Sequence, residues 1–310
     1  MVGHVPVLLK EAIDFLAVKR GGTYLDATVG LGGHSSEIAK RLGAPGHLIG
    51  FDKDPKALEI AAARLAVRSS SFGLGEGSGD VHTTQDQKQD WPLVTLIHGS
   101  FADLANSEQR TAYDGILADL GVSSLQLGDP ERGFSFQAEG PLDMRMNPMS
   151  GETAEQVVNH IDERELADVI YEFGEERRSR RIARAIVRSR PIHTTKQFVD
   201  VVSAAARSMK HERIHPATRT FQALRIFVNH ELDDLKALLV TAPRVLKPGG
   251  RLVVISFHSL EDRIVKDAMR EGAQQGLYRL LTKKPVTATV EEIDSNPRSR
   301  SAKMRAAERI

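Results

Sequence analysis

The chain has 310 residues, of which 41% are apolar and 27% are charged, a composition typical of a globular protein with a sizeable core. The net charge of +1 does not by itself indicate a nucleic-acid partner, so such a partner would have to be recognised by local basic patches. No cysteine, signal-peptide pattern or membrane-length apolar run occurs, which excludes disulfides and thiolate metal sites and predicts a cytoplasmic protein without a membrane anchor.

Strands and helices alternate over the first third of the chain. The pattern predicts helices at 34–43 and 55–66, and it predicts strands at 23–30, 47–54, 93–101 and 113–121. Strands that alternate with short helices form a parallel sheet with right-handed crossovers. The polar, Gly- and Ser-rich segment 66–92 lacks apolar periodicity and is predicted to be a surface insertion without a function of its own.

A helical block interrupts this α/β pattern. Strand signals vanish between 133 and 210, and apolar residues recur there at helical spacing, in 153–161, 163–174, 177–190 and 194–209. Beyond the block, the sequence predicts one or two helices over 217–246 and another strand over 247–259. We therefore predict an α/β domain made of residues 1–132 and 213–310, with a helical domain, residues 133–212, inserted into it.

The stretch DATVGLGGHS places three glycines in four positions directly after a predicted strand. A glycine-rich turn between a strand and a helix allows a ligand to approach the backbone closely and exposes N–H donors. Asp52 follows Gly32 by twenty residues, at the end of the next predicted strand, where a carboxylate can accept hydrogen bonds from both ribose hydroxyls. The pattern favours a nucleotide-like ligand; the alternative for Asp52 is a surface or helix-capping role.

Two details favour S-adenosylmethionine over a nicotinamide cofactor. Ser35 stands where the dinucleotide pattern G-x-G-x-x-G requires its third glycine, so a dehydrogenase is the less favoured alternative. DATVGLGG instead resembles the methyltransferase pattern of an acidic residue followed by alternate glycines. LKPGGRLVVIS resembles the segment that leads into the fifth strand of class I methyltransferases.

Ten longer motifs occur in order along the chain: GHVPVLLKE, GGHS, FDKDP, DLGVSSLQL, RGFSF, PLDMRM, GEERRSRRIARAIV, HPATRTFQALRI, ISFHSLEDRIVK and NPRSRSAKMRAAER. With them the sequence resembles the bacterial 16S rRNA cytosine-N4 methyltransferase family, known as RsmH or MraW, nearly throughout. The resemblance implies an α/β protein with a class I (Rossmann-like) S-adenosylmethionine-dependent methyltransferase fold and an inserted helical domain. It also implies methylation of the exocyclic N4 of a decoding-centre cytidine in 16S rRNA, within the small ribosomal subunit.

The resemblance also implies a set of cofactor-binding residues: Gly32, Gly33, His34, Asp52, Phe101, Asp119 and Gln126. Asp119 is in addition the candidate catalytic residue, since N4 of cytosine needs an acceptor for its N–H groups. The alternatives are a role of Asp119 toward the methionine amine alone, core packing for Phe101 and a solvent-facing loop amide for Gln126. Gly128 and Asn147 depart from the family pattern, which usually has Asp at both positions.

Seven arginines fall between Arg177 and Arg190 in a predicted helix. Arginine forks bind phosphate bidentately, so this stretch is a candidate RNA contact. The alternative is a solvated helix face whose arginines pair with Glu172, Glu175 and Glu176. The family resemblance favours RNA; it does not fix the oligomeric state, and a homodimer is compatible with the sequence.

Two alternative functions remain to be considered, a zinc protease and a non-catalytic protein. HERIH, residues 211–215, matches the zinc-protease pattern, but Pro216 disfavours helical geometry at His215, so no metal site is predicted. A non-catalytic ribosome-assembly or RNA-binding protein that keeps the fold would be expected to have lost the cofactor residues, yet Gly32, Asp52 and Asp119 are all present.

Overall fold

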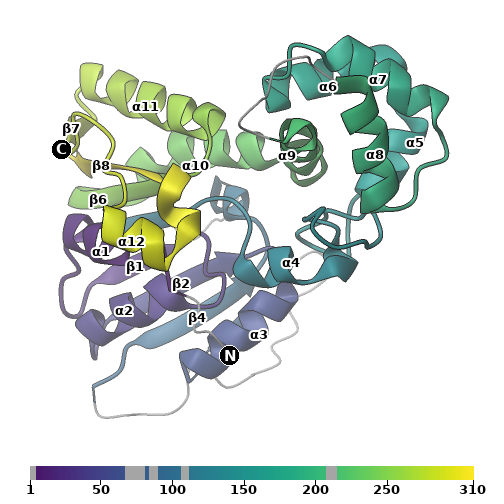
Figure 1. Cartoon of the computed structure of the whole chain (residues 1–310). Coiled ribbons are helices and arrows are strands. Elements are labelled where there is room, and N and C mark those ends of the chain that lie inside the picture. Colours follow the sequence, from purple (N-terminus) through teal and green to yellow (C-terminus); the bar gives the residue numbers. More distant parts are fainter. Residues whose placement is uncertain (1–4, 67–80, 84–89, 106–111, 207–214) are drawn as a thin grey trace. The chain divides into compact units, whose positions relative to one another are not determined.

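The computed structural model describes residues 5–66, 81–83, 90–105, 112–206 and 215–310 (Figure 1). The chain forms two compact units, Met1–Gly121 with Asp233–Ile310, and Val122–Leu232. The predicted domain boundaries at 132 and 212 therefore differ from those of the structure. The reason is apolar packing, since both flanks of the predicted helical domain contribute side chains to its core, among them Val122, Leu127, Phe221 and Leu224.

The first unit contains one eight-stranded sheet in the order β3-β4-β2-β1-β5-β6-β8-β7. Strands β4, β2, β1, β5 and β6 are parallel neighbours, and the remaining pairings are antiparallel. The predicted parallel α/β core is thus confirmed, whereas β3 lies within the segment that was predicted to be only a surface insertion. The strands are β1 (Thr23–Asp26), β2 (His47–Asp52), β3 (Val81–Thr83), β4 (Leu93–His98), β5 (Tyr113–Asp119), β6 (Leu246–Ser256), β7 (Tyr278–Leu280) and β8 (Lys303–Arg309).

Helices cover both faces of this sheet (Figure 1). Successive strand residues point to opposite faces, so Tyr24 enters one apolar cluster and Leu25 the other. The first cluster is completed by α1 (Leu9–Leu16), α2 (Gly33–Leu42) and α3 (Pro55–Arg64), and the second by α10 (Glu231–Val245) and α11 (Ser259–Gln274). Shorter elements of this unit are η1 (Phe101–Ala105), α12 (Val290–Ser295) and η3 (Pro297–Ser301).

Strand β1 marks the point where the sheet order reverses. The chain continues from β1 to β2 on one side and later to β5 on the other. In open α/β sheets, ligands bind outside the carboxyl ends of the strands at such a point. The glycine turn after β1 and the last residues of β2 and β5 therefore meet where a ligand site is expected.

The second unit is helical and has its own apolar core. Phe198 and Phe221 meet edge to face there, with ring centroids 5.4 Å apart, and Ile182 and Ile186 are fully buried beside them. The elements are α4 (Ser124–Gly128), η2 (Pro130–Arg132), α5 (Ala154–His160), α6 (Glu163–Gly174), α7 (Ser179–Arg188), α8 (Thr195–Ala206) and α9 (Pro216–Asn229). In the described ranges of both units, no helix combines the length and apolar character needed to cross a membrane.

Candidate functional site

Carboxylates gather at the carboxyl edge of the parallel strands. Asp26, Asp52 and Asp119 are the last residues of β1, β2 and β5, and Glu261 lies in the first turn of α11, which follows β6. The register places Asp26 beside Gly50 of β2 and Leu117 of β5, so these strand ends are neighbours. This edge is an acidic rim around the glycine turn.

The turn between β1 and α2 depends on glycine for its geometry. Gly30 and Gly32 have φ of 52° and 75°, which side chains rarely adopt. A Cβ on Gly32 would also lie 3.3 Å from Ala61, and one on Gly33 would collide with Pro6. An added Cβ on Gly30, in contrast, would meet no protein atom within 4 Å. The backbone at Gly30 is therefore open to a close approach.

Asp52 holds this turn in place. Its Oδ2 accepts a hydrogen bond from the Gly30 N–H at 2.7 Å, and its Oδ1 accepts one from the Asp54 N–H at 2.9 Å. The capping of α3 is performed by Asp54, which accepts from the Lys56 N–H, so the helix-capping alternative for Asp52 is wrong. Burial raises the pKa of Asp52 to about 6, against the two backbone hydrogen bonds, which lower it. Each of its oxygens retains a second lone pair for a further donor.

The carboxylate of Asp119 has a buried oxygen that accepts no hydrogen bond from any described residue. Its Oδ1 is buried and has no hydrogen-bond partner, while its Oδ2 lies 3.5 Å from His34 Nδ1. His34 Nε2 carries a hydrogen, because it lies 3.1 Å from the Val7 carbonyl oxygen, which can only accept. Burial, followed by the charges of Asp26 and Glu261, raises the pKa of Asp119 well above its usual range. An orphaned buried acceptor is a group that a ligand's N–H or ammonium donor would satisfy.

Two acidic residues of the rim were not among the predicted site residues. Asp26 is 1% exposed and accepts hydrogen bonds from Ser35 Oγ at 2.5 Å and from the Thr28 N–H at 3.1 Å. Glu261 is 2% exposed and accepts from the Phe257 N–H at 2.8 Å. The acidic position of DATVGLGG was the available signal for Asp26. For Glu261 it was the spacing from His258, with which it forms a capping box at the start of α11.

The titration of Asp26 gives a testable dependence of stability on pH. Burial raises its pKa in the folded protein to about 6, against hydrogen bonds that lower it, whereas an unfolded Asp titrates near 4. The folded state therefore binds the proton of Asp26 more tightly than the unfolded state does. The stability that this proton contributes is fully present below about pH 4 and is lost as pH rises through about 6. Between pH 4 and 7, the free energy of unfolding of Asp26→Asn, measured in urea titrations, should rise by up to about 3 kcal/mol relative to that of the wild type. Asp14→Asn, on the exposed face of α1, should parallel the wild type; a parallel profile for Asp26→Asn would contradict the expectation.

The remaining predicted residues are placed separately. Phe101 begins η1 and packs, partly buried, against the apolar cluster that contains α10. Gln126 is 4% exposed and forms a capping box with Ser123 at the start of α4, so the alternative of a solvent-facing loop amide is wrong. Because Gln126 belongs to the second unit, its part in the cofactor site stays a prediction.

The two departures from the family pattern fit their surroundings. An added Cβ on Gly128 would meet no atom within 4 Å, so a side chain has room there. Asn147 Oδ1 accepts a hydrogen bond from the Met149 N–H at 3.0 Å, a contact that an aspartate oxygen would make equally well. Neither position alters a strand end of the acidic rim.

The HERIH segment, considered above as a zinc-protease pattern, lies largely outside the described residues, which include only its last histidine. His215 precedes α9, caps it by accepting from the Ala217 N–H, and stacks at 5.1 Å on Phe136. Over the described ranges, no group of three or more His, Asp or Glu side chains is arranged to hold a metal ion.

Comparison with known proteins decides the family. The model of the MraW methylase family matches residues 1–310. This chain belongs to that family. A curated relative named "Ribosomal RNA small subunit methyltransferase H", from Koribacter versatilis, is 68% identical over 308 residues, which cover 99% of this chain and 94% of the relative. A relative of the same name from Acidobacterium capsulatum is 61% identical over 306 residues, covering 99% of this chain and 98% of the relative.

Membership in the MraW methylase family makes this protein a methyltransferase that uses S-adenosylmethionine as its methyl donor. The predicted class I (Rossmann-like) fold with a helical insertion is confirmed by the sheet order and by the second unit. The metalloprotease and dehydrogenase readings are wrong. The acidic rim and glycine turn are thus the place in this methylase to look for the cofactor site.

Proposed function

We propose that this methylase transfers a methyl group to the exocyclic N4 of a decoding-centre cytidine in 16S rRNA, within the small ribosomal subunit. Support for the substrate comes from the printed name of its 68%-identical relative, a small-subunit rRNA methyltransferase. Support for the chemistry comes from one observation, the buried carboxylate oxygen of Asp119 that lacks a hydrogen-bond partner at the end of β5.

The glycine turn and the rim supply groups that fit S-adenosylmethionine, which provides an electrophilic methyl group when bound. Asp52 has free lone pairs for the ribose hydroxyls, and the open backbone at Gly30 leaves room for the ligand. We assign cofactor binding to the residues predicted from the sequence: Gly32, Gly33, His34, Asp52, Phe101, Asp119 and Gln126. The two glycines set the turn, and His34 follows it at the start of α2.

Asp119 is assigned the role of hydrogen-bond and proton acceptor for N4. The lone pair of N4 is delocalised into the cytosine ring, so the nitrogen becomes a useful nucleophile only when its N–H groups meet an acceptor. Burial raises the pKa of Asp119, which makes its carboxylate a stronger base for the leaving proton. Burial keeps that acceptor away from competing water.

Binding of rRNA is assigned to the helical unit, with the arginines between Arg177 and Arg190 as candidate contacts. Two members of that stretch are structural, since the guanidinium groups of Arg178 and Arg190 donate to the backbone carbonyls of Ala206 and Val158. Arg184 pairs with Glu163, not with the glutamates considered in the sequence. Action in the cytoplasm is part of the same proposal, and a homodimer stays a prediction that sedimentation of the purified protein can check.

Methyl transfer to two forms of the substrate tests this proposal. Small ribosomal subunits that lack the modification and the 16S rRNA extracted from them are incubated with the enzyme and with S-adenosylmethionine labelled in its methyl group. We expect label in the rRNA of the subunits and much less in the extracted RNA. Label in subunit protein would overturn the substrate. Cofactor binding without transfer to either form would favour the non-catalytic assembly protein.

A further inference from the structure

Helix α7 separates its apolar and basic residues onto opposite sides. Ile182, Ala183 and Ile186 are fully buried in the core of the helical unit. Arg181, Arg184 and Arg188 recur at spacings of three and four, which places them on the other side of the helix, and all three are exposed. The helix thus presents a row of arginines about 10 Å long, since each residue rises about 1.5 Å along the axis.

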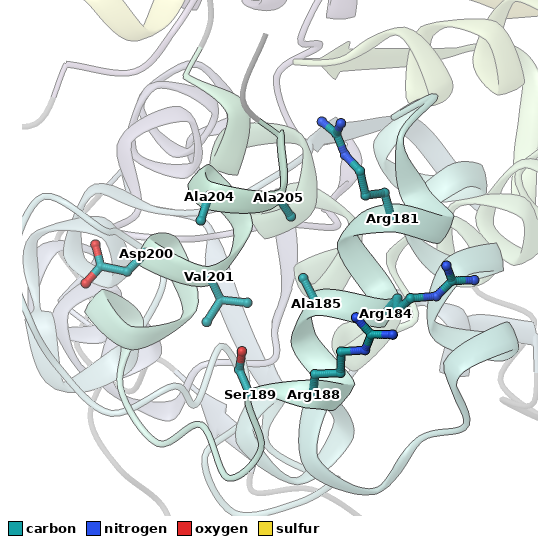
Figure 2. A pocket seen from close by; sticks show the side chains of 9 residues that line it. All are labelled: Arg181, Arg184, Ala185, Arg188, Ser189, Asp200, Val201, Ala204 and Ala205. Atoms are coloured by element: carbon teal, nitrogen blue, oxygen red, sulfur yellow. The ribbon is translucent and has the colours of Figure 1, made fainter.

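This row borders an open groove between α7 and α8, of about 710 Å³ (Figure 2). The other lining residues are small or apolar, apart from one carboxylate: Ala185, Ser189, Asp200, Val201, Ala204 and Ala205. Figure 2 shows the three arginines along one helix and Asp200 on the other side of the groove. Small side chains between the two helices leave the backbone of an extended ligand room to approach.

The residues that line the groove carry more positive than negative charge. Arg184 Nε lies 3.3 Å from Glu163 Oε1, but both side chains are largely exposed, at 59% and 42%, so water weakens this pair. Asp200 is the single carboxylate among the lining residues, against three guanidinium groups. A ligand with several anionic groups in a row, separated by apolar or planar groups, matches this arrangement.

We infer that the groove between α7 and α8 binds the sugar–phosphate backbone of a single-stranded stretch of the RNA substrate, with Arg181, Arg184 and Arg188 contacting phosphates. The inference rests on the proposed function, which supplies RNA as the partner. Guanidinium forks donate two parallel hydrogen bonds to a phosphate and also stack on bases, so they suit RNA better than isolated ammonium groups do. The length of the row allows contact with more than one phosphate.

The affinity for a fluorescent, cytidine-rich single-stranded RNA oligonucleotide, measured at several salt concentrations, tests whether the groove binds RNA. Each phosphate contact adds about 0.7 to the slope of log affinity against log salt for a single strand. Replacing Arg181, Arg184 and Arg188 together by Gln should therefore lower the slope by about 2, and affinity at about 200 mM salt by about 10- to 100-fold. Asp200→Asn should act in the opposite direction and strengthen binding about two- to fivefold, because it removes the carboxylate of the groove.

A matched control removes the same charge elsewhere in the unit. Arg164, Lys196 and Arg219 are exposed, lie outside the arginine-rich stretch and do not line the groove, so their joint replacement by Gln should leave most of the slope intact. All variants should keep the wild-type thermal midpoint and S-adenosylmethionine affinity. An equal loss of slope in both triple variants would contradict the assignment of the groove as an RNA-binding site. Competition by polyglutamate as strong as competition by RNA would contradict it as well.

The groove and the proposed function can fail separately. The groove variant is the joint replacement of Arg181, Arg184 and Arg188 by Gln. If the wild type methylates small subunits while this variant keeps full RNA affinity and salt slope, the groove is not the RNA-binding site and the proposed function stands. If the groove variant loses RNA affinity while the wild type methylates no rRNA, the function is wrong and only an RNA site remains. We expect the groove variant to raise KM for small subunits with kcat little changed.

Discussion

Replacing Asp119 by Asn is expected to lower kcat of methyl transfer by about 10²- to 10⁴-fold, the usual contribution of a positioned acid or base. The amide has nearly the same shape but cannot take a proton from N4. The orphaned Oδ1 of Asp119 and its raised pKa are the observations behind this expectation. Single-turnover transfer to small subunits, with the cofactor saturating, measures the chemical step directly.

Cofactor affinity of the same variant separates the two roles considered for Asp119. Because Asp119 is also assigned a cofactor contact, we expect Asp119→Asn to weaken S-adenosylmethionine binding by about tenfold in calorimetry, much less than it lowers kcat at saturating cofactor. Asp14→Asn, an exposed change on α1, is the control for loss of one carboxylate and should leave both quantities unchanged. A large loss of affinity with kcat preserved would show that Asp119 serves the methionine amine and not the cytosine.

Replacing Asp52 by Ala is expected to weaken S-adenosylmethionine binding by about 10- to 100-fold, since charge-assisted hydrogen bonds contribute about 1.5–3 kcal/mol each. The change also removes the acceptor for the N–H groups of Gly30 and Asp54, which donate hydrogen bonds to Asp52 in the wild type. Asp52→Asn keeps a carbonyl oxygen for one of these donors, so it should lose affinity with less loss of stability. Calorimetry for the cofactor, together with a thermal midpoint for each variant, separates the two effects.

An unchanged affinity in both Asp52 variants would contradict the ribose assignment. Asp103→Ala is a suitable control, because Asp103 is exposed in the η1 segment after β4 and is assigned no cofactor contact. It should bind the cofactor as the wild type does. A loss confined to Asp52→Ala, with Asp52→Asn unaffected, would assign Asp52 to the shape of the glycine turn alone.

Local sequence signals predicted most elements of the core. Helix α6 was predicted with its observed bounds, Glu163–Gly174, and α3 was predicted from its first residue, where Pro55 lacks an N–H that a helix start does not need. The alternation of strands and helices predicted the parallel sheet. The predicted strand at 23–30 was too long, because the chain leaves β1 at Asp26 to form the glycine turn.

Features that depend on distant contacts were not predicted. Strand β3 is only three residues long and is defined by its pairing with β4, which no local periodicity reveals. The domain boundaries moved because α9 lies after the predicted helical domain but packs into its core through Phe221. The acidic rim has the same origin: Asp26 and Glu261 are 235 positions apart in the chain and are brought to one edge by the sheet.

The identity of the methylated nucleoside is the most direct test of the proposed reaction. After transfer from S-adenosylmethionine labelled in its methyl group, rRNA of the small subunits is digested to nucleosides, which are separated and identified by mass spectrometry. We predict a single labelled product, N4-methylcytidine, at one position. Label in 5-methylcytidine or in a purine nucleoside would contradict the assignment of Asp119 as the acceptor for N4, although the protein would remain a methyltransferase.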